Sequence, residues 1–326
     1  MTRGRYLLLF AGIAIFAALA FHGGVGVVAR AFATLRLQGL AIATLIHLPI
    51  PILMALAWWS VGRDVQGATP ANFIAARLVR DSVSETLPFS QIGGFLSGLR
   101  MLALTGADTL RGAFAMFADL VIEFSAKLLY ALAGVLVLFY ILPGSTLIRP
   151  FIAVLACAIA ILVTVTLFRG PIMIMLGNFA PRLIGAWVAQ KSGRDLRAEF
   201  ARFSWRGAMP CFAIHIGCWL FGAVEAWVTL KLMGIPVTAG QALVIDSVAT
   251  TLRTFGFLVP AAIGVQEAGY VLACALFGIG PGGAVAFSLV RRARDILIAM
   301  PGLAAWQFLE LRAYRRRFPV EASPPK

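Results

Sequence analysis

Charged side chains recur inside apolar stretches of this sequence, at intervals that place them on single helix faces. Residues four apart in a helix are neighbours on its surface. An ionisable group at the middle of a membrane costs about 2.5–3.5 kcal/mol, so it usually faces a partner or a water-filled cavity. The charged sets are Arg77, Asp81 and Glu85; Asp119, Glu123 and Lys127; and Arg291 with Asp295, beside Arg292 and Arg294.

These charges allow two interpretations. In the first, opposite charges four residues apart neutralise each other along each helix, and the polar faces only pack helices together. In the second, acids and arginines on several helices line a cavity for a polar headgroup, with Arg for a phosphate or carboxylate and Asp or Glu for an amine. We predict such a cavity, with the candidate substrate-binding residues Glu85, Arg100, Asp119, Glu123, Arg253, Glu267, Arg291 and Asp295.

The composition requires that helices in a lipid bilayer position these residues. Of 326 residues, 60% are apolar and 13% are charged, whereas soluble domains have about 45–50% apolar and about 25% charged residues. A membrane span needs about 20 residues, so the chain has room for about seven to nine membrane segments. The sequence predicts an all-α, polytopic transmembrane helix bundle without a large soluble domain. We expect spans near 6–29, 37–61, 113–142, 147–168, 208–233, 240–259, 262–279 and 282–311, the last in one or two pieces.

The net charge of +14 is better explained by membrane orientation than by nucleic-acid binding. Lys and Arg are concentrated at the N-terminus, over 169–206 and near the C-terminus. By the positive-inside rule, we expect the N-terminus and the 169–206 loop on the cytoplasmic side of the membrane. We interpret 1–318 as a single membrane domain, in which an amphipathic linker over 169–206 joins the halves 1–168 and 207–318, and 319–326 as a disordered tail.

Other chemistry finds little support in the sequence. The four cysteines and three histidines are isolated within apolar runs, without the spacing of a metal site, so we interpret them as packing residues. The P-loop, zinc-protease and serine-hydrolase motifs are missing from the sequence. Residues 24–29 match the dinucleotide pattern GxGxxA, but they lie in a membrane run and no acid follows about 20 residues on, so we reject this match. We therefore expect no catalytic residue, metal or cofactor, while an intramembrane lipid-modifying enzyme stays an open alternative.

Two polar segments interrupt the apolar pattern and are weakly similar to each other. Both begin Asp-Ser-Val, at Asp81 and at Asp246, and both reach a Pro followed by Ile-Gly. Paired Gly/Pro interruptions in two halves of a membrane protein point to a transporter site between repeats. The alternative is two helices that are merely kinked at Pro. We expect helix breaks at Pro88, Gly93, Pro260 and Gly264.

These segments, together with the run from Arg291 to Asp295, resemble the flippase-like family, also called the lysylphosphatidylglycerol synthase transmembrane-region family. The resemblance covers essentially the whole chain, and the stretch 81–94 is most similar to hopanoid-biosynthesis-associated membrane proteins. It implies an inner-membrane bundle with an inverted or pseudo-repeated core that is associated with moving polar lipids between leaflets. The family's Pro-x-x-x-Gly-x-x-Glu element matches Pro260, Gly264 and Glu267, but the first half has no acid in the corresponding place.

The resemblance leaves two functions open. One is translocation or trafficking of a polar lipid, either a hopanoid or a phospholipid. The other is an accessory subunit that does not transport but organises a lipid (hopanoid) biosynthesis machinery. Several family members carry a cytosolic domain that transfers lysine or alanine from aminoacyl-tRNA to phosphatidylglycerol. We expect no such synthase activity here and no nucleic-acid partner, and we expect membrane lipids and hopanoid-biosynthesis proteins as partners.

Overall fold

The computed structural model describes residues 25–86, 90–146, 148–168, 206–255 and 264–317, and within these ranges it contains helices and no strand. The prediction of an all-α bundle is confirmed. Most of the predicted 6–29 span and of the 169–206 linker, together with Pro88, Pro260 and the 319–326 tail, lie outside the described residues. The helices are α2 (Val25–His47), α3 (Pro49–Val61), α4 (Pro70–Thr86), α5 (Ser90–Leu104), α6 (Thr109–Ile141), α7 (Ile148–Leu167), α11 (Ala208–Leu232), α12 (Ala239–Phe255), α13 (Val265–Ala275) and α14 (Pro281–Arg317).

Three stretches of the described chain are helical, long and apolar enough to cross a membrane: Leu35–Val61, Thr109–Ile141 and Ala208–Leu232. The longest helix of the three, α6, begins where the Asp108 carboxylate accepts hydrogen bonds from the backbone N–H groups of Leu110 and Arg111. This cap satisfies donors that a helix start leaves unpaired. With 33 residues, α6 is roughly 50 Å long, so it exceeds the hydrocarbon thickness of about 30 Å.

The helix found in the predicted 262–279 span is too short to cross a bilayer, whereas α12 of the predicted 240–259 span borders residues outside the described ranges. The sequence predicts membrane segments over 240–259 and 262–279, but α12 and α13 have 17 and 11 residues. They are therefore roughly 26 and 17 Å long. The helix restarts after Gly264, whose φ of 84° favours glycine, and apolar residues on both sides of this break had indicated two full spans. By contrast, the predicted 282–311 span is one 37-residue helix, α14, with Pro301 inside it.

Each of the two polar segments forms a pair of short helices. We call α4 with α5 the first hairpin and α12 with α13 the second hairpin, because the two helices of each pair pack against each other. In both hairpins, a glycine allows the two helices to approach each other closely. A Cβ at Gly94 would lie 2.6 Å from the Arg80 carbonyl oxygen, and one at Gly269 would lie 3.0 Å from the Ala249 Cα. The first of these glycines belongs to a GxxxG pair with Gly98, a pattern that permits close helix contact.

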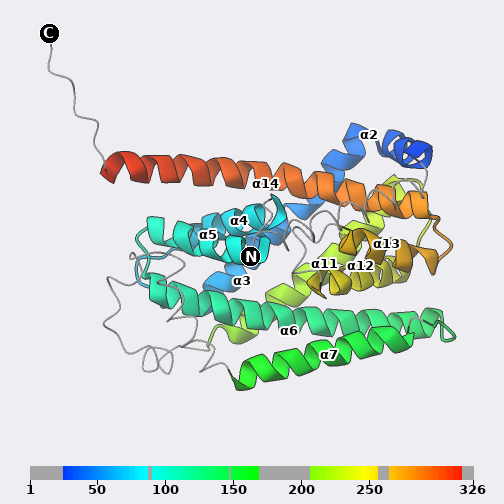
Figure 1. Cartoon of the computed structure of the whole chain (residues 1–326), viewed down its shortest axis with the longest axis horizontal. Helices are drawn as coiled ribbons and strands as arrows, with labels where there is room; N and C mark the ends of the chain where they lie inside the picture. The colour runs from blue at the N-terminus through cyan, green and yellow to red at the C-terminus, as the bar shows by residue number, and fades with distance from the viewer. Residues whose placement is uncertain (1–24, 87–89, 147, 169–205, 256–263, 318–326) are drawn as a thin grey trace, which may run out of the picture.

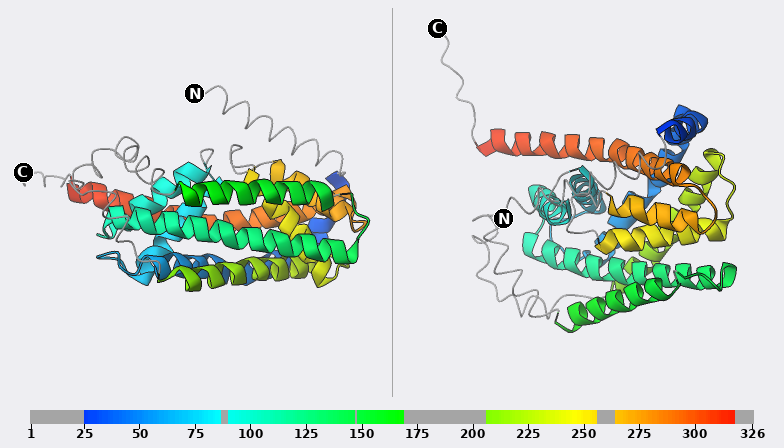
Figure 2. Two further views of the ribbon diagram at one scale, coloured as in Figure 1. Left: turned by 90° about the horizontal axis from the view of Figure 1, so that it is seen from below. Right: turned by 45° about the vertical axis from the view of Figure 1, so that its right-hand side comes forward.

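The two hairpins occupy the interior of the bundle, between two long helices. In Figure 1, α14 runs along one edge of the molecule and α6 with α7 runs along the opposite edge. Helix α14 contacts α4 and α13, and α6 contacts α5 and α12. Figure 2 shows the same arrangement from two further directions. Both long helices therefore touch both hairpins, which places the hairpin side chains between them.

Separate apolar cores hold the two hairpins in place. The first hairpin packs into a core that includes Trp58, Phe73 and Leu102, and the second packs into a core that includes Ile245 and Phe287. On the outside, large apolar side chains stay exposed, as at Leu136 of α6, which is 60% exposed. Such exposure fits a surface that faces lipid rather than water.

Candidate functional site

A cavity of about 260 Å³ lies between the hairpins and the long helices. Helices α4, α6, α11, α12, α13 and α14 all contribute to its wall, together with residues of α2 and α3. Ligand pockets for drug-sized molecules measure about 300–1,000 Å³, so this cavity suits a headgroup better than a whole lipid. Its charged and histidine side chains are His47, Arg77, Arg80, Asp81, Glu85, Glu123, Lys127, Asp246, Arg253, Arg291, Arg294 and Asp295.

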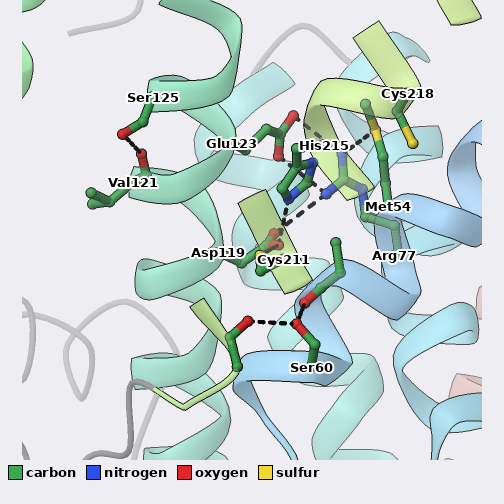
Figure 3. A network of polar contacts seen from close by, with 12 residues as sticks. Met54, Ser60, Arg77, Asp119, Val121, Glu123, Ser125, Cys211, His215 and Cys218 are labelled. Atoms are coloured by element: carbon green, nitrogen blue, oxygen red, sulfur yellow. Dashed lines mark hydrogen bonds and ion pairs between the residues drawn. The ribbon is translucent and has the colours of Figure 1, made fainter. Parts of the chain in front are cut away.

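The first charged cluster joins the first hairpin to α6. The Arg77 guanidinium donates to Asp81 at 2.7 Å and to Glu123 at 3.1 and 3.3 Å. Asp119, whose side chain has no exposed surface, accepts hydrogen bonds at 3.4 Å from both Arg77 and Arg80. Figure 3 shows Arg77, Asp119 and Glu123 converging between their helices. The arginines thus come from α4 and two of the three acids from α6.

Helix α11 closes this cluster with a histidine and a cysteine. His215 Nε2 lies 2.9 Å from Asp119 Oδ1, and the Cys211 thiol donates to the same oxygen at 3.6 Å. Both side chains were interpreted from the sequence as packing residues, but they contact the most buried acid of the cluster. These two groups and Asp119 present possible metal-ligand atoms within 4.8 Å of one another. Because two arginines already hydrogen-bond to Asp119, a metal ion there would compete with both guanidinium groups.

The second charged cluster joins the second hairpin and α11 to α14. Arg291 of α14 pairs with Asp246 of α12, and Arg294 pairs with Glu225 of α11. Asp246 also accepts a hydrogen bond from the Tyr130 hydroxyl at 2.7 Å. The set is completed by His47 Nδ1, which lies 2.8 Å from Glu225, and by Asp295, which lies 2.6 Å from Arg294. Here the arginines come from the long helix.

One ion pair connects the two hairpins across the cavity. The Arg253 guanidinium of α12 donates to the Glu85 carboxylate of α4. These side chains are 23% and 24% exposed, whereas the arginines of the two clusters are 4–7% exposed. The connection between the hairpins is thus the more accessible part of the charged lining.

The pairing shows that the charges are not neutralised along single helices alone. Arg77 and Asp81 do pair along one helix, as local neutralisation requires. However, Arg291 pairs with Asp246 and Glu225 on other helices, and Glu123 pairs with arginines of α4. The charges therefore hold separate helices together around a shared cavity.

Five of the eight predicted cavity residues line the cavity: Glu85, Glu123, Arg253, Arg291 and Asp295. Asp119 lies behind the wall, where it holds Arg77 and Arg80. Glu267 caps α13 by accepting the Gly264 N–H at 2.7 Å and pairs with Arg292, so its buried carboxylate supports the second hairpin. Arg100 is also placed elsewhere, because it binds Glu310 of α14 at 2.8 Å.

Of the four predicted helix breaks, only Gly93 and Gly264 lie within the described residues. Helix α4 ends at Thr86 and α5 begins at Ser90; α12 ends at Phe255 and α13 begins after Gly264. Gly93, which we expected at a break, lies within the first turn of α5. The two prolines that would produce the breaks lie outside the described residues.

Sequence reasoning left several residues of the charged clusters and of the cavity wall out of the candidate set; Glu225 belongs to a cluster but does not line the cavity. Glu225 stands alone in an apolar run, and the membrane cost that singled out the other acids applies equally to it. Asp246 begins the second polar segment, and Lys127 belongs to the four-residue series on α6. The sequence pattern could therefore have identified both as cavity residues. His47 and Arg80 had no distinctive spacing, because their partners Glu225 and Asp119 are distant in the sequence.

Fold and site together define a class: a helical membrane protein with a charged cavity between two pairs of short, interrupted helices. A family model for the lysylphosphatidylglycerol synthase transmembrane region matches residues 7–302. The chain therefore belongs to this family, as the resemblance predicted. No curated protein and no solved structure shows a significant match to the chain.

Proposed function

We propose that this protein helps to move a polar lipid between the leaflets of the bacterial inner membrane. The headgroup passes through the charged cavity while the acyl chains stay in the bilayer. The observation that carries the proposal is the cavity itself, whose wall has acids and arginines from both hairpins and from both long helices. Membership of a family named for a lipid-related membrane region agrees with a lipid as the substrate.

The arrangement of charges supports a path for a headgroup. Water is scarce within a bilayer, so a headgroup that crosses needs polar partners along its way. The clusters supply hydrogen-bonding groups that stay in place because each is bound to a second helix. The more exposed Glu85–Arg253 pair connects the hairpins. We propose that this pair separates to open the path for the headgroup.

The test is reconstitution of the full chain in liposomes that contain a headgroup-labelled phospholipid and a membrane-impermeant reagent that destroys the label. The wild-type protein should make the inner-leaflet label accessible. Reversal of one charge, Glu85→Arg, places two arginines together and should reduce the rate about tenfold or more. The exchanged double variant, Glu85→Arg with Arg253→Glu, restores an opposite pair and should recover much of the rate.

Glu310→Gln is the matched control, since it removes another partly exposed Arg–Glu pair that does not line the cavity. Its rate should equal that of the wild type. A wild-type rate no higher than that of protein-free liposomes would contradict transport of this lipid class. Unchanged rates in both Glu85 variants would contradict the role of the hairpin connection.

A further inference from the structure

Lys127 differs from the other cationic side chains of the described cavity wall. Each of the arginines that line the cavity, Arg77, Arg80, Arg253, Arg291 and Arg294, has a carboxylate oxygen within 4.0 Å. No ion pair of this kind is found for Lys127 among the described residues. Its ammonium instead donates to the Thr254 hydroxyl at 3.1 Å and lies 4.5 Å from the centre of the Trp219 ring.

The two segments that connect the helices of the hairpins, residues 87–89 and 256–263, have no acid of their own. The nearby acid Glu123, one turn earlier on α6, is bound to Arg77 and Arg80. A cation that has lost much of its water, with one hydrogen bond to a hydroxyl, still has ammonium donors to offer to an anion.

A buried donor without a partner lies beside this lysine. The Trp219 indole N–H is buried and makes no hydrogen bond within the described protein, and Trp219 lines the same cavity. A buried donor without an acceptor is unfavourable. The ring is held in place by stacking on Tyr130, with centroids 6.1 Å apart. The indole N–H on α11 thus lacks an acceptor, and the ammonium on the adjacent helix α6 has one hydrogen-bond acceptor for its three donors.

We infer that Lys127, with Trp219, forms an anion subsite that binds the phosphate group of the transported molecule. From the sequence, phosphate binding is assigned to the arginines, but each arginine of the cavity wall is already paired with a carboxylate of the protein. The inference rests on the proposed function for the identity of its ligand, a phospholipid headgroup. The same chemistry would also accept free inorganic phosphate, which the experiment must separate from the lipid.

The experiment measures lipid retention by the purified full chain, which requires no movement between leaflets. Protein in detergent is incubated with phosphatidylglycerol or with diacylglycerol of the same acyl chains, and bound lipid is counted by native mass spectrometry. Lys127→Gln should lower phosphatidylglycerol retention about tenfold or more, as expected for the loss of a charge-assisted hydrogen bond. Diacylglycerol retention should not change, and Lys127→Arg should keep most of the phosphatidylglycerol.

Lys231→Gln is the matched control. Lys231 lies 4.1 Å from the Trp227 ring centre, as Lys127 lies over Trp219, but it is outside the cavity wall. Its removal should leave retention unchanged. Equal phosphatidylglycerol retention by wild type and Lys127→Gln, or equal retention of the two lipids by the wild type, would overturn a lipid phosphate site.

Inorganic phosphate is tested in parallel by isothermal titration. Phosphate binding that is lost in Lys127→Gln, without any lipid preference, would support the anion subsite and identify its source as the free ion. If neither probe depends on Lys127, the subsite is rejected. If lipid retention depends on Lys127 but reconstituted protein moves no lipid, the proposed function fails and the phosphate site stands.

Discussion

The two charged clusters use corresponding elements with the signs of the charges exchanged. In the first cluster, the hairpin helix α4 supplies Arg77, Arg80 and one acid, Asp81, and the long helix α6 supplies the acids Asp119 and Glu123. In the second, the hairpin helix α12 supplies the acid Asp246, and the long helix α14 supplies Arg291 and Arg294. Each hairpin is thus fixed to a long helix by buried opposite charges, whichever side carries the positive one.

This comparison suggests which parts of the molecule are rigid and which can move. Breaking a buried ion pair is expensive, because the remaining charge is left without water or a partner. The contacts within each cluster are therefore expected to persist. The contact between the hairpins, Glu85 with Arg253, is more exposed, and exposed pairs contribute only about 0–1 kcal/mol. Of the charged contacts, the Glu85–Arg253 pair between the hairpins therefore costs least to break, which suits a path that opens and closes.

The largest predicted effect comes from removing the central acid of either cluster. Asp119→Ala leaves Arg77 and Arg80 with fewer acids in a site that has no exposed surface. The free energy of unfolding should fall by about 3–5 kcal/mol, measured by reversible unfolding in mixed micelles. Glu225→Ala, which removes the acid shared by Arg294, Arg291 and His47, should cost a similar amount.

Equal losses would support the view that the two clusters are equivalent. A loss of less than about 1 kcal/mol at either acid would contradict a buried, obligatory pairing there. A large loss at Asp119 alone would mean that only the first hairpin is fixed by charge. Asp119→Asn should destabilise less than the alanine variant, because its side-chain carbonyl still accepts hydrogen bonds from the arginines.

The sequence was informative about this pattern to the extent that the relevant interactions are local. Helix class follows from composition, and the four-residue spacing of Arg77 and Asp81 correctly indicated a shared helix face. The same reasoning could not predict that Arg291 binds Asp246, 45 residues earlier in the chain, rather than Asp295. Which charges meet across helices is decided by tertiary packing, and the sequence alone carries no signal of it.

The second hairpin shows a second limit of prediction from the sequence. Apolar residues on both sides of Gly264 satisfy the composition of a membrane span, so they predicted spans over 240–259 and 262–279. The structure instead has two short helices that lie against each other. A hydropathy pattern records which residues avoid water, but it does not distinguish a helix that faces lipid from one enclosed by other helices. Glu267 illustrates the point, since its carboxylate caps α13 rather than lining the cavity.

A smaller effect is predicted for the glycines at the close contacts within the hairpins. A Cβ at Gly94 would meet the Ser84 hydroxyl at 1.9 Å and the Arg80 carbonyl oxygen at 2.6 Å. Because backbone cannot move aside as a side chain can, Gly94→Ala should cost about 1–3 kcal/mol. Gly269→Ala should cost less, since its nearest neighbour is the Ala249 Cα at 3.0 Å. Thermal unfolding of the two variants in the same detergent measures the difference.

Gly217 provides the control, because a Cβ there would meet nothing within 4 Å. Gly217→Ala lies in the middle of α11 and should leave stability unchanged or raise it by up to about 1 kcal/mol, since alanine favours the helix. If Gly269→Ala were as destabilising as Gly94→Ala, the second hairpin would be as tightly packed as the first. If neither variant lost stability, the close approach would not depend on glycine.

The smallest effect is expected for the Arg100–Glu310 pair, which gives the sharpest contrast with Glu85–Arg253. Both pairs are partly exposed, with side-chain exposures of 28% and 33% for the former and of 23% and 24% for the latter. Each should therefore contribute no more than about 1 kcal/mol to stability. Only the second pair lines the cavity, so neutralising it should slow lipid movement, while Arg100→Gln should change neither stability nor transport appreciably. A transport defect in Arg100→Gln, with normal unfolding, would show that the contact between α5 and α14 also takes part in opening the path. The assignment of the opening to the Glu85–Arg253 pair alone would then be wrong.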